Sequence, residues 1–248
     1  MIRLIIVVLF VVLFLILSIP IMFVEWIIGK FNPGVKDRSS LAIVNWAFRV
    51  VLFLAGTKVT FIGLENVPTD TPVLYVGNHR SFFDVVITYT KVARVTGYIA
   101  KKEIEKVPLL RNWMRNLHCL FLDRKDIKAG LKTILEAIEL MKCGISICIF
   151  PEGTRNRNQD ELDMLPFHEG SFKIATKTKC PVIPIAISNS ADIFEAHFPK
   201  IKPAKVVVEY GKPIYPDELS KEDKKHIGEY TQNIIHEMLV KNKPLTQN

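Results

Sequence analysis

The sequence predicts an α/β fold: a largely parallel sheet flanked by helices, with hydrophobic helices at the N-terminus. After Gly56, short runs rich in β-branched and aromatic residues alternate with helical patterns. These runs are apolar on both faces, as in parallel sheets that helices cover on both sides. Before Gly56, two long apolar stretches predict helices of a different kind.

The first apolar stretch, residues 4–24, is interrupted only by Ser18 and Pro20. Its roughly twenty residues are long enough to cross the hydrocarbon core of a membrane. Glu25 and Trp26 follow where a signal peptide would carry small residues at a cleavage site, and Trp26 resembles an interfacial anchor. We therefore expect a retained hydrophobic helical membrane anchor.

The second stretch, residues 41–55, carries Asn45, Trp46 and Arg49 and is too short and polar for a comfortable span, so we expect an interfacial helix. Basic residues separate the two stretches: Lys30, Lys36 and Arg38. If the first helix spans, this positive charge places the rest of the chain on the cytoplasmic side. A helical hairpin that dips into one leaflet fits the same hydropathy, so both geometries stay open.

These boundaries divide the chain into membrane-associating helices at residues 1–55 and an α/β domain at residues 56–248. We expect a linker at residues 32–40 and a frayed tail at residues 242–248. The expected strands are residues 58–62, 73–76, 98–100, 119–122, 145–150, 182–187 and 205–210.

Two helices have clear start signals. Asp126 is an expected N-cap, and the helix after it ends near Gly144. Its apolar stripe should pack in the core: Ile127, Leu131, Ile134, Leu135, Ile138 and Met141. Ser220 and Asp223 predict a capping box for a packing helix near the C-terminus.

Charge and cysteine content restrict the partners and the compartment. Thirty-three basic and 25 acidic residues give a net charge of +8, which favours an anionic partner. The hydrophobic N-terminus favours a phospholipid surface over nucleic acid, for which no basic and aromatic ladder is present. The cysteines form no Cys-x-x-Cys pair, which predicts buried thiols in a reducing compartment rather than a zinc site: Cys119, Cys143, Cys148 and Cys180.

The heptapeptide at residues 78–84, NHRSFFD, places His79 and Asp84 five positions apart directly after an expected strand. Side chains share a helix face at spacings of three or four, so His79 should lie in a turn and Asp84 in the first helical turn. Ser81 reads as an N-cap with Asp84 closing a capping box. The pair is a candidate general base and its orienter, although such pairs also arise by chance.

Other expected strands also end in reactive groups. Lys101 follows the run at 98–100, Arg124 follows the run at 119–122, and the segment 151–155 follows the run at 145–150. In an open α/β sheet, ligands bind beyond the carboxyl ends of the strands, so these groups should meet at one rim. Gly153 would allow close approach of the backbone, and Arg155 could hold a phosphate with two hydrogen bonds.

These segments resemble the four ordered motifs of the glycerolipid acyltransferase family, and within it the lysophosphatidic acid acyltransferases. The matching segments are NHRSFFD at 78–84; AKKEI at 100–104 through VP at 107–108 to FLDR at 121–124; FPEGTR at 150–155; and VIPI at 182–185. The resemblance covers roughly residues 56–215. It implies that His79 is the general base and that Asp84 orients it. It also implies a site for the acceptor's glycerol phosphate: Lys101, Arg124, Glu152, Gly153, Thr154 and Arg155.

The implied reaction moves an acyl chain from a thioester donor to the sn-2 hydroxyl of lysophosphatidic acid at the cytoplasmic face of a membrane. No cofactor or metal is expected, and the donor, acyl-coenzyme A or acyl carrier protein, stays open. The chain departs from the family pattern at Arg111 and His118, where many members carry glycine, and at His168, where many carry lysine. Transfer to another lysolipid such as lyso-ornithine lipid, and a non-catalytic membrane-tethered lipid-binding protein, are the alternatives.

Overall fold

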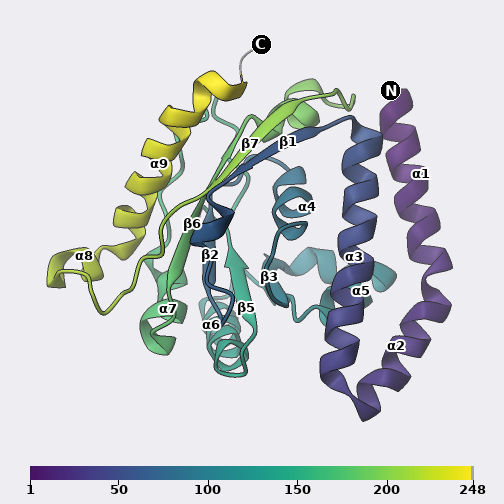
Figure 1. Ribbon diagram of the computed structural model, residues 1–248, viewed down its shortest axis with the longest axis horizontal. Coiled ribbons are helices and arrows are strands. Elements are labelled where there is room, and N and C mark those ends of the chain that lie inside the picture. The colour runs from purple at the N-terminus through teal and green to yellow at the C-terminus, as the bar shows by residue number, and fades with distance from the viewer. Residues whose placement is uncertain (247–248) are drawn as a thin grey trace.

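The computed structural model describes residues 1–246, apart from the side chain of Ile127. Within these residues the core is a seven-stranded sheet in the order β1-β7-β6-β2-β5-β3-β4 (Figure 1). The strands are β1 Lys58–Ile62, β2 Leu74–Gly77, β3 Thr96–Lys101, β4 Leu120–Leu122, β5 Ser146–Ile149, β6 Val182–Ser188 and β7 Lys205–Tyr210. They follow the expected runs closely, and the prediction of a helix-flanked α/β fold is confirmed.

The sheet is mixed because β7 runs against β6, while β1 pairs parallel to β7. The strands from β2 to β6 are parallel to one another. Parallel strands end at one edge of a sheet, so the turns after β2, β3, β4, β5 and β6 all lie on the same rim.

Helices cover both faces of the sheet, which explains why the strands are apolar on both sides (Figure 1). Tyr75 and Ile183 belong to the core shared with Ile87 and Trp113, whereas Leu74 belongs to the core on the opposite face. The covering helices of the α/β part are α4 Phe83–Tyr89, α5 Pro108–Asn116, α6 Ile127–Lys142, α7 Lys173–Thr178, α8 Lys221–Lys225 and α9 Ile227–Thr246. Short 3₁₀ helices lie in the connections at Leu64–Asn66, Lys102–Lys106, Glu169–Phe172, Ser190–Ile193 (η4) and Glu195–His197 (η5).

The N-terminal helices form a hairpin along one side of the domain (Figure 1). Its helices are α1 Ile2–Leu17, α2 Ile19–Phe31 and α3 Pro33–Ala55. The first two are bent by 48° at their junction, next to Pro20. By length and composition, α3 is the one helix of the described chain that is long and apolar enough to cross a membrane, and the bent pair is a second candidate if taken as one span.

The expected linker at residues 32–40 is wrong, because these residues begin α3. Asn32 caps the helix by accepting a hydrogen bond from Val35 N at 3.1 Å, and Pro33 occupies its first turn. Both are strong helix-start signals. The second apolar stretch is therefore part of a 23-residue helix, longer than the expected interfacial helix.

Polar contacts fix the hairpin to the α/β part. Trp113 Nε1 donates to Ser18 Oγ at 2.9 Å, at the bend between α1 and α2. Asp37 of α3 lies 2.9 Å from His118 Nε2 in the turn before β4. The inward face of α3 is buried, while most of the outward face of α1 and α2 is exposed and apolar.

Two further expectations need correction. In α6, Leu131 and Leu135 are exposed, because the helix turns Ile138 and Met141 toward the sheet instead; the side chain of Ile127 lies outside the described residues. The expected tail at 242–248 is helical through Thr246, and Asn242 is fully buried. Residues 247–248 lie outside the described residues.

Candidate active site

His79 lies in the turn between β2 and α4, at the carboxyl rim of the sheet. Its Nδ1 donates to Asp84 Oδ2 at 2.8 Å. That hydrogen bond defines the tautomer in which Nε2 carries the free lone pair. The ring stacks on Phe150 with centroids 4.4 Å apart, and 16% of the side chain is exposed. His79 is thus held on two sides and can accept a proton at Nε2.

Asp84 is fully buried in the first turn of α4. Its Oδ2 also accepts hydrogen bonds from Arg80 N and Ser81 N, each at 2.8 Å. The bond to Ser81 N is the backward half of the expected capping box, whereas Ser81 Oγ accepts from Phe83 N at 3.0 Å. The Asp84 carboxylate therefore both holds the backbone of the turn in place and orients the imidazole of His79.

The turn is anchored to the sheet by Asn78. Its fully buried side chain donates to Ile187 O at 2.9 Å and accepts from Ile187 N at 2.8 Å. These two hydrogen bonds continue the pairing of β2 with β6 by one residue. They fix the position of the backbone just before His79.

Glu152 lies in the loop three positions after the end of β5 and holds the backbone of His79. Its Oε1 accepts from His79 N at 2.6 Å, and its Oε2 accepts from Leu165 N at 3.1 Å. The residue is 4% exposed, and burial raises the pKa of its carboxyl, an effect that the hydrogen bond from His79 N partly offsets. Glu152 thus joins the turns after β2 and β5.

The next residues of this loop approach the rim. Gly153 adopts a φ of +70°, and a Cβ there would lie 3.3 Å from the ring of His168. Thr154 is exposed. Arg155 Nη1 donates to Glu195 Oε1 at 2.9 Å, and its guanidinium lies 3.6 Å from the centroid of the Phe82 ring. Arg155 is therefore held at its edge by a carboxylate and on its face by an aromatic ring.

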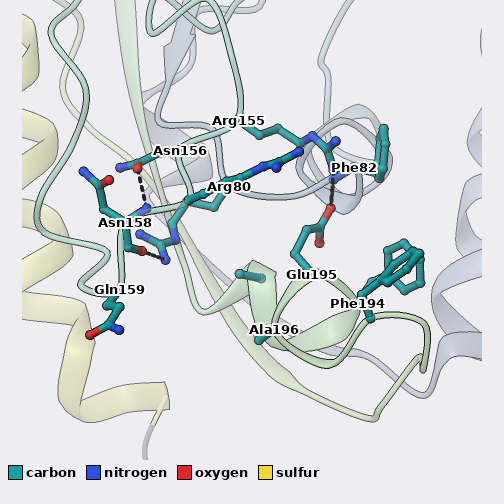
Figure 2. Close-up of a pocket in the computed structure, with 12 residues that line it drawn as sticks. Arg80, Phe82, Arg155, Asn156, Asn158, Gln159, Phe194, Glu195 and Ala196 are labelled. Atoms are coloured by element: carbon teal, nitrogen blue, oxygen red, sulfur yellow. Dashed lines mark hydrogen bonds and ion pairs between the residues drawn. The ribbon is translucent and has the colours of Figure 1, made fainter.

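A cleft of about 600 Å³ opens beside Arg155 (Figure 2). Its polar lining includes Arg80, Arg157 and Asn158, and its apolar lining includes Phe194 and Phe198. The Arg80 guanidinium donates to Asn158 O at 2.6 Å and to Asp160 O at 3.0 Å, which ties the loop after β5 to the His79 turn. The cleft combines cationic and aromatic groups, so it suits an anionic amphiphile.

Lys101 and Arg124 lie on the other side of His79, at the ends of β3 and β4. Lys101 pairs with Glu103 at 3.1 Å, and the side chains of both are more than half exposed. Desolvation lowers the pKa of Arg124, and the negative charge of Glu103 opposes this shift. Because β5 separates β2 from β3, these cations stand about 10 Å or more from the β2 terminus by sheet spacing. They do not line the described cleft.

Sequence reasoning missed several residues of this rim. Arg80 lies inside the NHRSFFD segment, and Arg157 follows FPEGTR by two positions, so both had a local signal. Glu195 had none, since it lies in the loop after β6, outside the motif segments.

The cysteines are unpaired in the described residues, and three of the four are buried. Cys143 is exposed, unlike the expected buried thiol. Burial raises the pKa of Cys119 to about 11 and that of Cys148 further, so neither thiol is ionised at neutral pH. Within the described residues, no group of three His, Cys, Asp or Glu side chains is arranged to hold a metal ion.

Comparison with known proteins links this rim to one family. The family described as Acyltransferase matches residues 58–188. The 1-acyl-sn-glycerol-3-phosphate acyltransferase of Borreliella burgdorferi is 32% identical over 157 residues, covering 63% of this chain and 62% of that protein. The protein of the same name from Cocos nucifera is 30% identical over 200 residues, covering 80% of this chain and 62% of that protein. The chain thus spans less than two thirds of these relatives' lengths.

A solved structure has the same fold. It is the 1-acyl-sn-glycerophosphate (LPA) acyltransferase PlsC of Thermotoga maritima, with a TM-score of 0.80, 23% identity and coverage of 97% of each chain. Because the coverage includes nearly the whole of this chain, the likeness in fold extends to the N-terminal helices.

Proposed function

Because the chain belongs to the acyltransferase family, we propose that it is a membrane-bound 1-acyl-sn-glycerol-3-phosphate acyltransferase. It transfers an acyl chain from a thioester donor to the sn-2 hydroxyl of lysophosphatidic acid, which forms phosphatidic acid for phospholipid synthesis. The observation that carries this proposal is the His79–Asp84 pair. It lies in a turn whose next residue, Arg80, lines the arginine-rich cleft.

His79 supplies the base. Its Nε2 takes the proton of the sn-2 hydroxyl as the oxygen attacks the thioester carbonyl, and Asp84 stabilises the imidazolium that forms. The tetrahedral intermediate then collapses, the carbon–sulfur bond breaks, and the thiolate leaves with the proton from His79. Ser81 Oγ donates to Glu195 at 2.6 Å, so we assign it no nucleophilic role.

The acceptor phosphate would lie at Arg155, with the loop of Glu152, Gly153 and Thr154 beside it and with Lys101 and Arg124 on the far side. Arginine suits this role because its planar fork can give a phosphate two parallel hydrogen bonds. The thioester is already activated and the base is an imidazole, so the proposed reaction uses no metal or resident cofactor. Either acyl-coenzyme A or acyl-acyl carrier protein fits this chemistry.

We propose that residues 1–55 attach the catalytic domain, residues 56–248, to the cytoplasmic face of a membrane. The support is the exposed apolar face of α1 and α2, which includes Ile5, Phe23 and Trp26. The α/β part packs against the hairpin through α4 and α5, so attachment would hold the catalytic rim near the lipid acceptor.

Flotation of full-length protein and of a variant beginning at Thr57, on anionic vesicles at low and high salt, tests the attachment. Apolar insertion should survive high salt, because screening weakens only the electrostatic attraction. Release of the full-length protein by salt alone would contradict insertion.

Acyl transfer from both donors to a panel of lysolipids tests the activity. His79→Ala should lower kcat about 10³-fold, the range for loss of a general base, and Asp84→Asn should be milder because the imidazole remains. The matched control is His236→Ala, an exposed histidine on α9. Near-normal turnover by His79→Ala would overturn the mechanism, and lipid binding without turnover by the unsubstituted protein would favour the non-catalytic alternative.

A further inference from the structure

Glu195 receives three hydrogen bonds from two separate parts of the rim, and Figure 2 shows the one from Arg155. Its Oε1 accepts from Phe82 N and from Arg155 Nη1, each at 2.9 Å, and its Oε2 accepts from Ser81 Oγ at 2.6 Å. The side chain is 21% exposed. Glu195 belongs to η5, in the connection between β6 and β7, so it reaches the site from an element that carries none of the motifs.

One consequence concerns Arg155. An arginine side chain is long and loses rotamer freedom when it binds a ligand, which weakens binding unless the side chain is already fixed. Glu195 takes one N–H of the guanidinium while Phe82 stacks on its face at 3.6 Å. Since a guanidinium carries five N–H groups, donors are left over for a phosphate.

The second consequence concerns the turn that carries the base. Ser81 and Phe82 lie directly before α4, whose first turn holds Asp84. By accepting from Phe82 N, this carboxylate pairs a backbone N–H that the helix itself leaves without an acceptor. Its negative charge also interacts favourably with the positive end of the helix dipole. The same side chain therefore joins the start of the helix that holds Asp84 to the arginine of the neighbouring loop.

An ordinary surface ion pair would explain little of this arrangement. Exposed pairs contribute about 0–1 kcal/mol and leave both side chains mobile. A carboxylate beside an anion site also repels the anion. Glu195 is half-buried and accepts from three donors. This arrangement is best explained if the benefit of holding Arg155 in place outweighs the repulsion between Glu195 and the anion.

We propose that Glu195 is a positioning residue for acyl transfer, which aims Arg155 at the acceptor phosphate and links it to the His79 turn. This inference rests on the proposed function. The contacts of Glu195 are to Arg155 and to the turn at Ser81 and Phe82. On this proposal, its loss changes the use of the acceptor and leaves the KM of the donor intact.

Steady-state kinetics of four single variants test the proposal. Glu195→Ala raises the KM for lysophosphatidate about tenfold while the donor KM stays within twofold, as expected for loss of preorganisation. Glu195→Asp keeps the charge but is too short to reach both partners, and it raises the acceptor KM about fivefold. Glu195→Gln keeps an acceptor for Phe82 N and Arg155 and can donate to Ser81, so it stays within about threefold of the unsubstituted protein. The matched control is Asp192→Ala, an exposed acid in η4 of the same connection, which changes neither KM.

A double variant identifies the route. In an Arg155→Ala background, Glu195→Ala should raise the acceptor KM no further, because the side chain it positions is gone. Equal effects on both substrates, full additivity with Arg155→Ala, or the same kinetics for Glu195→Ala and Asp192→Ala would each overturn the proposal. If Glu195→Ala does not fold, as judged by thermal melting, Glu195→Asp decides by the same acceptor-to-donor comparison.

Binding separates failure of this inference from failure of the proposed function. If the unsubstituted protein transfers no acyl chain, the proposed function is wrong, and calorimetric titration with lysophosphatidate still decides on Glu195. A Kd that rises about tenfold in Glu195→Ala supports positioning of Arg155, and an unchanged Kd overturns it.

Discussion

The two cationic sides of the rim differ in how the protein holds them. On one side are the partly buried cleft arginines Arg80 and Arg155; on the other are the edge cations Lys101 and Arg124. Arg155 is 24% exposed and is fixed by Glu195 and Phe82. Lys101 is 53% exposed, and its partner Glu103 is equally free in solvent.

Cations at the ends of neighbouring strands are therefore not equivalent. A half-buried charge acts in a medium of lower dielectric and is weakly screened. Water and salt screen most of the attraction between an exposed charge and a bound anion. We therefore expect the cleft arginines to determine acceptor affinity, and the edge cations to make a smaller contribution that depends on salt.

Replacing Arg155 should have the largest effect on this comparison. Arg155→Ala should lower kcat/KM for lysophosphatidate about 100-fold, since loss of a charge-assisted, bidentate contact costs about 2–3 kcal/mol. The donor KM should change little. The comparison variant is Arg157→Ala, an exposed arginine two positions on, for which about a threefold effect is expected. Equal losses for the two variants would show that fixation by Glu195 and Phe82 has no bearing on affinity.

The edge cations should respond more weakly and in a different way. Lys101→Ala and Arg124→Ala should each raise the acceptor KM about two- to fivefold at low ionic strength, the range of an exposed charge. At 1 M salt the Debye length falls to about 3 Å, so these effects should vanish while that of Arg155→Ala persists. Assays at two salt concentrations measure this. If the Lys101→Ala effect survives high salt, the edge cations close onto the acceptor and do not differ from the cleft arginines in this way.

The sequence predicted the sheet better than it predicted the rim. Strands buried on both faces are largely apolar, so β2, β5 and β6 stand out without any knowledge of their neighbours. His79 and Asp84 are also a local signal, because one short turn holds both. The reversed direction of β7 had no such signal, since it depends on the path of the loop before it.

What the sequence could not predict depends on contacts between distant segments. Glu195 reaches Ser81 across 114 positions. The exposure of Leu131 and Leu135 depends on how α6 is rotated against the sheet, which its periodicity alone does not determine. The expected linker at 32–40 was instead a local error, because Asn32 and Pro33 form a helix start that is visible in the sequence.

A last contrast concerns stability rather than affinity and involves two glutamates, one on each side. Burial raises the pKa of Glu152, whereas the pKa of Glu103 is lowered by its backbone hydrogen bond and by Lys101. A raised pKa means that the folded protein binds this proton more tightly than the unfolded chain. Glu152 should therefore reduce the free energy of unfolding as pH rises from its ordinary value near 4.5 through the raised one. Glu103 has the opposite sign, but it is fully exposed and should hardly register.

Urea denaturation between pH 4 and pH 7 measures this contrast. Glu152→Gln should be less stable than the unsubstituted protein at pH 4 by about 1–3 kcal/mol, because its amide nitrogen would face the N–H of His79 or Leu165. The gap should narrow toward pH 7, since only the unsubstituted protein then pays for a buried charge. Glu103→Gln is the matched control and should follow the unsubstituted protein throughout. The contrary result is a difference in the free energy of unfolding between Glu152→Gln and the unsubstituted protein that widens as pH rises. It would mean that the ionised carboxylate stabilises the turn by more than the cost of burying its charge. The two glutamates would then respond to pH in the same direction.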